Sequence, residues 1–201
     1  MESKKIYLVR HGQTDLNTKG VMQGSGVDAD LNETGKKQAE TFFERHKNVP
    51  FDKVYVSALK RTAQTVASFV ENGVPMERLA GLNEISWGII EGKVPSPEER
   101  QTHESTLKAW AGGDYERAMP EGESPLDVVK RQQEAMERIM ENVEEKNVLV
   151  CLHGRALKIL LTWLTGGSLS EMERFTHTNL SLYILEYVGG TFRILEHDQR
   201  V

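Results

Sequence analysis

The chain has almost none of the residues from which small proteins build disulfides or structural metal sites. It contains one cysteine, Cys151, among 201 residues, so an intramolecular disulfide and a thiolate cluster for zinc are both excluded. Four of its six histidines, at positions 46, 103, 177 and 197, are scattered without the spacing of metal ligands. The lone thiol fits a reducing compartment, and no structural metal is expected.

Long apolar runs and an excess of positive charge are also missing. No stretch approaches the roughly 20 apolar residues of a membrane-spanning helix, and the first apolar run is too short for a signal peptide. Lysine and arginine number 25 against 30 aspartate and glutamate residues, which gives a formal net charge of −5. Such a chain lacks a general attraction for nucleic acids. We therefore expect a cytoplasmic protein that binds neither nucleic acid nor membrane.

Short apolar runs alternate with amphipathic helical stretches along the sequence, which predicts an α/β sandwich. The hydrophobic fraction of 38% can fill a core, and no repeat or linker divides residues 1–201, so a single domain is expected. The predicted strands cover residues 5–10, 54–56, a short stretch near 79, 148–152, and a hairpin of 181–187 and 191–197. The predicted helices cover residues 32–45, 59–70 with Ser57 as N-cap, a stretch opened by a capping box at Ser124, and the stretch between Gly154 and Gly166.

Two of the predicted strands end in the same dipeptide, His11-Gly12 near the start and His153-Gly154 much later in the chain. If these strands are neighbours in one parallel sheet, both imidazoles emerge side by side at its carboxyl edge, where open α/β sheets hold their active sites. Neutral imidazole is a good nucleophile toward phosphorus, and a protonated partner can hold the oxyanion that develops. The pair therefore indicates phosphoryl chemistry.

Further polar residues are predicted at the same edge. Arg10 precedes the first histidine, and Arg61 lies about one turn inside the helix that follows the second strand, so both guanidinium groups can reach phosphate oxygens. Asn17 and a polar turn at residues 23–24 lie nearby in the sequence. Glu84 ends the third apolar stretch, and it is the acidic group that we expect to protonate a leaving alkoxide.

Four sequence blocks together resemble, in order, the signature of the histidine phosphatase superfamily, also called the phosphoglycerate mutase-like family. They are residues 8–14 (LVRHGQT) with Asn17 and residues 23–24, residues 57–65 (SALKRTAQT), residues 83–92 (NEISWGIIEG), and residues 153–154 (HG). The blocks span nearly the whole chain, so the match is far more specific than the Arg-His-Gly tripeptide alone. A departure at residues 28–35 (DADLNETG) affects a turn and a helix cap more than the chemistry.

The resemblance implies a three-layer α/β/α sandwich with a mostly parallel central sheet, and a phosphohistidine mechanism. His11 would be the nucleophile, Glu84 the proton donor, and His153 a further catalytic group that holds phosphate oxygens. The other groups expected at the phosphate are Arg10, Asn17, Arg61 and Gly154. Because guanidinium and imidazolium charges can take the place of a metal ion, neither a metal nor another cofactor is expected.

Contacts to the rest of the substrate are predicted from fewer signals. Gln23, Gly24 and Arg155 are candidate substrate contacts, with a solvated first-turn arginine as the alternative for Arg155. Residues 93–123 contain three prolines, a Gly-Gly pair and many charges, which favours an irregular, partly helical insertion that forms a lid over the sheet edge, with a solvated surface excursion as the alternative.

The short chain and the segment Ile85-Ser86-Trp87-Gly88 after the candidate acid favour a phosphatase of small phosphorylated metabolites. The expected partner is thus a small-molecule phosphate ester. Two alternatives stay open: a 2,3-bisphosphoglycerate-dependent phosphoglycerate mutase, and a noncatalytic phosphate-binding regulatory protein, against which both histidines and Glu84 argue. The physiological substrate and the oligomeric state are not predicted, and a homodimer is one option.

Overall fold

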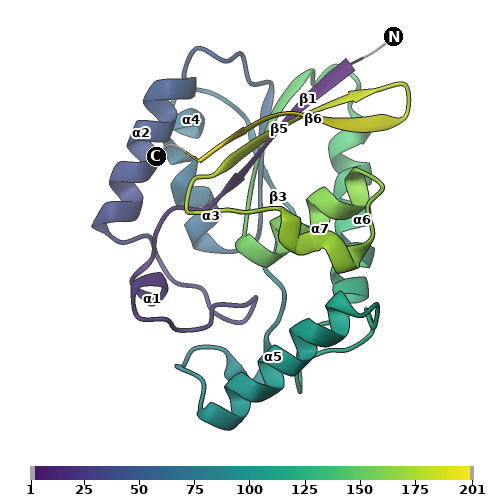
Figure 1. Ribbon diagram of the computed structural model, residues 1–201. Helices are drawn as coiled ribbons and strands as arrows, with labels where there is room; N and C mark the ends of the chain where they lie inside the picture. Colours follow the sequence, from purple (N-terminus) through teal and green to yellow (C-terminus); the bar gives the residue numbers. More distant parts are fainter. Residues whose placement is uncertain (1–2, 200–201) are drawn as a thin grey trace.

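The computed structural model describes residues 3–199, and within them six strands form one sheet in the order β3-β2-β4-β1-β5-β6 (Figure 1). The strands are β1 Ser3–Arg10, β2 Lys53–Val56, β3 Met76–Arg78, β4 Asn147–Leu152, β5 Leu182–Val188 and β6 Thr191–Asp198. Strands β3, β2, β4 and β1 run parallel, whereas β5 is antiparallel to both of its neighbours. The predicted, mostly parallel sheet with a hairpin at its edge is confirmed.

The central strands are apolar on both faces because helices cover both sides of the sheet. In β1, Ile6 and Leu8 belong to one buried cluster, whereas the alternate residues Tyr7 and Val9 belong to the cluster on the opposite face. The residues of β4 divide between the two clusters in the same alternating way. Alternate residues of each strand therefore face two separate hydrophobic cores, one on each side of the sheet.

Helices α2, α3 and α4 cover one face of the sheet, and α6 and α7 cover the other (Figure 1). The α-helices of the described residues are α1 Asp15–Thr18, α2 Glu33–His46, α3 Lys60–Thr65, α4 Ala67–Glu71, α5 Pro97–Ala111, α6 Pro125–Glu141 and α7 Gly154–Leu164; short 3₁₀ turns are η1 Ala80–Leu82, η2 Gly88–Ile90 and η3 Leu169–Arg174. The three-layer α/β/α arrangement is confirmed. Among residues 3–199, no helix combines the length and the apolar character needed to cross a membrane.

Two helix starts follow the predicted capping chemistry. The side chain of Asn32 accepts a hydrogen bond from the backbone N–H of Gly35 at the start of α2. Ser124 and Asp127 form a reciprocal capping box at the start of α6, whose first residue is Pro125. Such local bonds satisfy N–H groups that the helix itself leaves unpaired.

The single helix predicted over 59–70 is wrong. The β-branched Val66 adopts φ −110° and ψ 10°, which divides the segment into α3 and α4. At the start of α3 the hydroxyl of Ser57 accepts the backbone N–H of Leu59 at 3.1 Å, and Oδ1 of Asp28 accepts that of Lys60 at 2.7 Å. A residue remote in sequence thus supplements the predicted local one.

Residues 93–123 are more regular than predicted, because their central part forms the 15-residue helix α5. Its start is a capping box between Ser96 and Glu99 with Pro97 as the first helical residue, so this proline opens a helix rather than marks a loop. Trp110 packs with Ile159 of α7 in a third apolar cluster. This cluster anchors α5 beyond the carboxyl ends of the parallel strands (Figure 1).

Candidate active site

The two histidines that follow β1 and β4 lie side by side. The strands are parallel neighbours with Arg10 opposite Leu152, so the next residues, His11 and His153, leave the sheet at the same level. Their ring centroids are 5.1 Å apart, and the ring planes are inclined by 57°. The predicted meeting of two imidazoles at one sheet edge is confirmed.

His11 presents one defined nitrogen to a ligand. Its Nδ1 lies 2.7 Å from the carbonyl oxygen of Gly12, which can only accept, so Nδ1 carries the proton and Nε2 keeps its lone pair. Burial, followed by the charges of Arg10 and Arg61, holds the pKa of His11 well below its ordinary value. The ring is therefore neutral at pH 7 and can act as a nucleophile through Nε2.

His153 and Arg61 lie behind His11, and both are fully buried. Nε of Arg61 donates to Nδ1 of His153 at 3.1 Å, so the ring proton is on Nε2, which lies 2.9 Å from the hydroxyl oxygen of Ser57. Two more bonds from Arg61 end on backbone carbonyls. Burial and the Arg61 charge also hold the pKa of His153 well below its ordinary value.

Arg10 provides a second guanidinium at the pocket. Its NH1 group lies 3.2 Å from Nδ1 of His177, and its buried Nε has no hydrogen-bond partner among residues 3–199. A buried donor without a partner fits a site that receives an anion. Gly154 makes this packing possible, because a Cβ there would lie 2.7 Å from Cε1 of His177 and 3.5 Å from Nε of Arg10.

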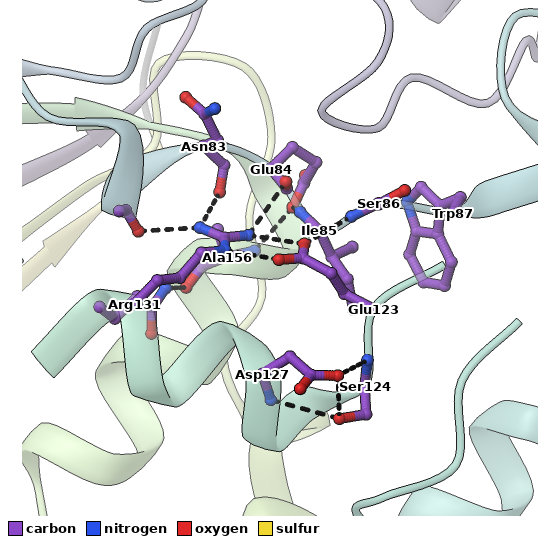
Figure 2. A network of polar contacts seen from close by, with 12 residues as sticks. Asn83, Glu84, Ile85, Ser86, Trp87, Glu123, Ser124, Asp127, Arg131 and Ala156 are labelled. Carbon is purple, nitrogen blue, oxygen red and sulfur yellow. Dashed lines mark hydrogen bonds and ion pairs between the residues drawn. The ribbon is translucent and has the colours of Figure 1, made fainter. Parts of the chain in front are cut away.

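Glu84, which is only 7% exposed, reaches the pocket from the segment after η1. Its carboxylate accepts backbone N–H groups of Ile85 at 2.9 Å, Ala156 at 2.8 Å and Arg155 at 3.0 Å (Figure 2). Two of these donors belong to the first turn of α7, so the carboxylate also caps that helix. The side chain is thus held in one place by bonds from two segments.

These groups surround a cavity of about 330 Å³. Its lining residues come from the strand ends, α1, α5, α7 and the loops between them: Arg10, His11, Asn17, Val21, Met22, Gln23, Glu84, Trp87, His103, Gly154, Arg155, Lys158 and His177. In the part of the chain that the structure describes, no group of three or more His, Cys, Asp or Glu residues is arranged to hold a metal ion. The arginine and lysine side chains that line the cavity are those of Arg10, Arg155 and Lys158.

A model of the histidine phosphatase superfamily, branch 1, matches residues 6–200. The chain belongs to this superfamily. It is 35% identical over 190 residues to mouse 6-phosphofructo-2-kinase/fructose-2,6-bisphosphatase 1, with 92% of this chain but only 38% of that protein covered. It is 31% identical over 195 residues to a broad-specificity phosphatase of Saccharomyces cerevisiae, with 92% and 80% covered.

Solved structures of similar proteins have the same architecture. Bacillus stearothermophilus YhfR matches with a TM-score of 0.83 and 29% identity over 98% of each chain. The alpha-ribazole phosphatase of Shigella flexneri matches with a TM-score of 0.82 and 24% identity over 98% of this chain and 96% of that one. At this identity the second match shows the fold, which is that of the histidine phosphatases.

Most of the predicted site residues line the cavity. They are Arg10, His11, Asn17, Gln23, Glu84, Gly154 and Arg155. Arg61 and His153 lie directly behind these residues. Gly24 is not among the lining residues, and its role as a substrate contact stays a prediction. A Cβ at Gly24 would collide with the carboxylate of Glu91, so the glycine permits close packing of two loops.

Six lining residues were not among the predicted site residues: Val21, Met22, Trp87, His103, Lys158 and His177. Lys158 lies one helical turn after Gly154, so the i, i+4 spacing on α7 was a usable signal. His103 comes from α5, and His177 comes from the loop before β5. His103 belongs to the 93–123 segment that is expected to form a lid, whereas His177 had no local signal, because only the packing of its loop beside the strand ends brings its ring to the cavity.

Arg155 and Lys158 share one counter-ion at the outer part of the cavity. Both side chains form ion pairs with Glu173, and they are 13% and 15% exposed. The Arg155 guanidinium also lies 5.9 Å from the ring centre of Trp87 and 5.6 Å from that of Trp110, so the solvated alternative for this arginine is wrong. Burial raises the pKa of Glu173, but the hydrogen bonds from Lys158 and Arg155 outweigh it and lower the pKa to about 2.

Proposed function

We propose that this chain is a phosphomonoesterase that hydrolyses small phosphorylated metabolites through a phosphohistidine on His11. The observation that carries this proposal is the His11 ring, which is buried and neutral, with its Nδ1 proton committed to the Gly12 carbonyl and Nε2 left for attack. Membership of the histidine phosphatase superfamily and the phosphatase names of several relatives support it.

The proposed reaction has two steps. In the first, the Nε2 lone pair of His11 attacks phosphorus, the bond between phosphorus and the ester oxygen breaks, and the leaving oxygen takes a proton from Glu84. In the second, water attacks the phosphohistidine while Glu84 takes a proton from that water, and the bond between phosphorus and nitrogen breaks. Inorganic phosphate leaves, and both side chains return to their starting states.

The arginines are assigned to the phosphate oxygens. Nε of Arg10, which is buried without a partner among the described residues, gains a hydrogen bond when a phosphate oxygen arrives. Arg61 uses three N–H donors in the protein bonds described above, which leaves two of its five for the phosphate. His153 is assigned an Nε2–H that passes from Ser57 to a phosphate oxygen in the transition state.

The substrate class is argued from the outer part of the cavity. Arg155 and Lys158 offer two positive charges to the part of the substrate beyond the phosphate, and Glu173 neutralises only one of them. A metabolite with a second anionic group, a carboxylate or another phosphate, fits this surplus of charge. One relative is named for fructose 2,6-bisphosphate, which is such a compound. In this proposal residues 93–123 serve as a lid, through His103 of α5.

Rapid-quench kinetics with phosphate-labelled substrate tests the proposal. The wild-type enzyme should yield an acid-labile, base-stable adduct on His11, and His11→Ala should yield none and lose turnover. His197→Ala, which changes an exposed ring on β6, is the matched control and should behave as wild type. Wild-type turnover in His11→Ala, or label on another residue, would show that the mechanism is wrong. Conversion of 3-phosphoglycerate without net phosphate release would identify a mutase instead.

A further inference from the structure

Arg131 of α6 holds the chain around Glu84 (Figure 2). A guanidinium group has five N–H donors, and all five of Arg131 bond within the protein. Three reach the backbone carbonyls of Gly81, Asn83 and Glu84, at 2.8, 2.8 and 3.1 Å. The other two reach the carboxylate of Glu123, at 2.8 and 3.0 Å. Every donor of Arg131 therefore bonds either to the backbone of residues 81–84 or to the carboxylate of Glu123.

Glu123, at the end of the 93–123 insertion, extends the contact to the other side of Glu84. Its Oε2 also accepts the backbone N–H of Ser86 at 2.8 Å, and the Ser86 carbonyl accepts the N–H of Glu123 at 2.9 Å. The side chains of Arg131 and Glu123 are only 20% and 26% exposed, and their pairing is bidentate. One ion pair thus holds the backbone before and after Glu84.

The carboxylate of Glu84 is held from a different direction. Its oxygens accept N–H groups from Arg155 and Ala156 in the first turn of α7. The position of the carboxylate therefore depends on two helices, on α7 through these N–H groups and on α6 through Arg131. Loss of the α6 contacts would leave the main chain of Glu84 free to shift while its carboxylate still caps α7.

We propose that Arg131, anchored by Glu123, is a positioning residue for proton transfer by Glu84. Arg131 acts through Glu84 rather than on the substrate, because it sets where the main chain of the acid lies. Proton transfer needs a separation of about 2.6–3.2 Å between donor and acceptor, and a displacement of about 1 Å can cost about 10²-fold in rate. This inference rests on the proposed function of Glu84 as the acid.

The test compares Arg131→Met with Arg138→Met. Arg138 lies two turns further along α6 and bonds Glu77 and Glu141 at the surface, so its removal controls for the loss of an arginine from this helix. Arg131→Met should lower the rate of phosphoenzyme formation, measured by rapid quench in a single turnover, about 10²-fold for the best alkyl phosphate of a substrate panel, whose alkoxide needs a proton. For p-nitrophenyl phosphate, whose leaving group is stable as an anion, the loss should stay below about threefold. Arg138→Met should change kcat less than about twofold with either substrate.

A double-variant cycle separates positioning from general damage to the site. Glu84→Gln should by itself lose activity selectively with the alkyl phosphate, and adding Arg131→Met should cost little more, because the group that Arg131 positions is already lost. Additive losses, or equal losses with both substrates, would overturn the inference. If Glu84→Gln itself fails to distinguish the substrates, the proposed role of Glu84 is wrong and the inference falls with it.

A milder variant covers the case in which Arg131→Met does not fold, since that substitution leaves three carbonyls without their donor. Glu123→Gln keeps the guanidinium and its carbonyl bonds but weakens the anchor. It should show a smaller loss that is again confined to the alkyl phosphate. A loss that p-nitrophenyl phosphate shares equally would contradict the positioning role.

Discussion

The two walls of the cavity are built in opposite ways. The strand wall holds His11 and His153, which are 3% and 0% exposed, each with Nδ1 in a hydrogen bond within the protein. The outer wall holds Arg155 and Lys158, which share the carboxylate of Glu173, a side chain that is 57% exposed. The difference teaches that the groups assigned to phosphoryl transfer are fixed, whereas the groups assigned to the rest of the substrate are held by exchangeable bonds.

The physical basis of this difference is the cost of breaking each set of contacts. An ion pair with an exposed partner contributes about 0.2–1 kcal/mol, so a substrate anion can replace Glu173 at little cost. Leaving a buried donor or acceptor unpaired costs about 1–3 kcal/mol, so the strand wall keeps its arrangement when a substrate binds. Variants of the two walls should therefore behave differently.

The largest effect is expected at the strand wall, with Gly154→Ala. The new Cβ would lie 2.7 Å from Cε1 of His177 and push that ring, and Arg10 bonded to it, out of place. We expect kcat to fall about 10²-fold for alkyl and p-nitrophenyl phosphates alike, because the phosphate position itself is disturbed. Gly112→Ala at the end of α5, where the nearest atom is 3.4 Å away, is the control and should be neutral. Unchanged turnover in Gly154→Ala would refute the claimed rigidity of this wall.

A smaller and selective effect is expected at the outer wall, with Glu173→Gln. Two positive charges then lack their counter-ion, so the KM for substrates with a second anionic group should fall about two- to tenfold. The measurement compares 3-phosphoglycerate with glycerol 3-phosphate, which differ in one carboxylate. Glu171→Gln, two residues earlier on η3 and paired with Arg174, should change neither KM. Equal shifts for both substrates would argue against a charge-selective outer wall.

His177 lies between the two walls, close to Arg10 on one side and to Arg155 and Lys158 on the other. Its titration should affect how the free energy of unfolding depends on pH. Burial, then the charges of Arg10, Lys158 and Arg155, lower its pKa to about 3. Below about pH 6.5 the unfolded chain binds a proton at this residue that the folded chain refuses, so the free energy of unfolding should fall as the pH decreases from about 6.5 to about 3. His177→Gln should reduce the slope of this decline by an amount that corresponds to up to about one bound proton. The measurement is the free energy of unfolding in urea between pH 7 and pH 4. Parallel curves for the two proteins would contradict the assignment.

No effect at all is expected from chelation. In the proposed mechanism two guanidinium groups, of Arg10 and Arg61, and the two imidazoles of the strand wall bind the phosphate, so turnover should survive dialysis against EDTA, and vanadate should inhibit by occupying the same groups. Loss of activity on dialysis that Mg²⁺ or Zn²⁺ restores would show that these side chains are not sufficient.

Sequence reasoning was most successful where a local pattern encodes local structure. Short apolar runs marked β1 and β4, and the capping residues Asn32 and Ser124 marked the starts of α2 and α6. It was incomplete where a residue distant in sequence bonds to a helix start, as Asp28 does when it accepts the backbone N–H of Lys60 in α3. A capping pattern in the sequence shows that a side-chain oxygen is available nearby. It does not show which other oxygens the fold brings to the N–H groups of the helix start.

The sequence by itself determined the strands, most helix starts, the two His-Gly strand ends and the family to which they belong, because these features are written in consecutive residues. Only the tertiary structure decided that β4 pairs with β1, that His177 reaches Arg10, and that Arg131 holds the segment of Glu84. Such contacts join residues that are distant along the chain. They form because the whole core packs in one way, and no local pattern carries that information.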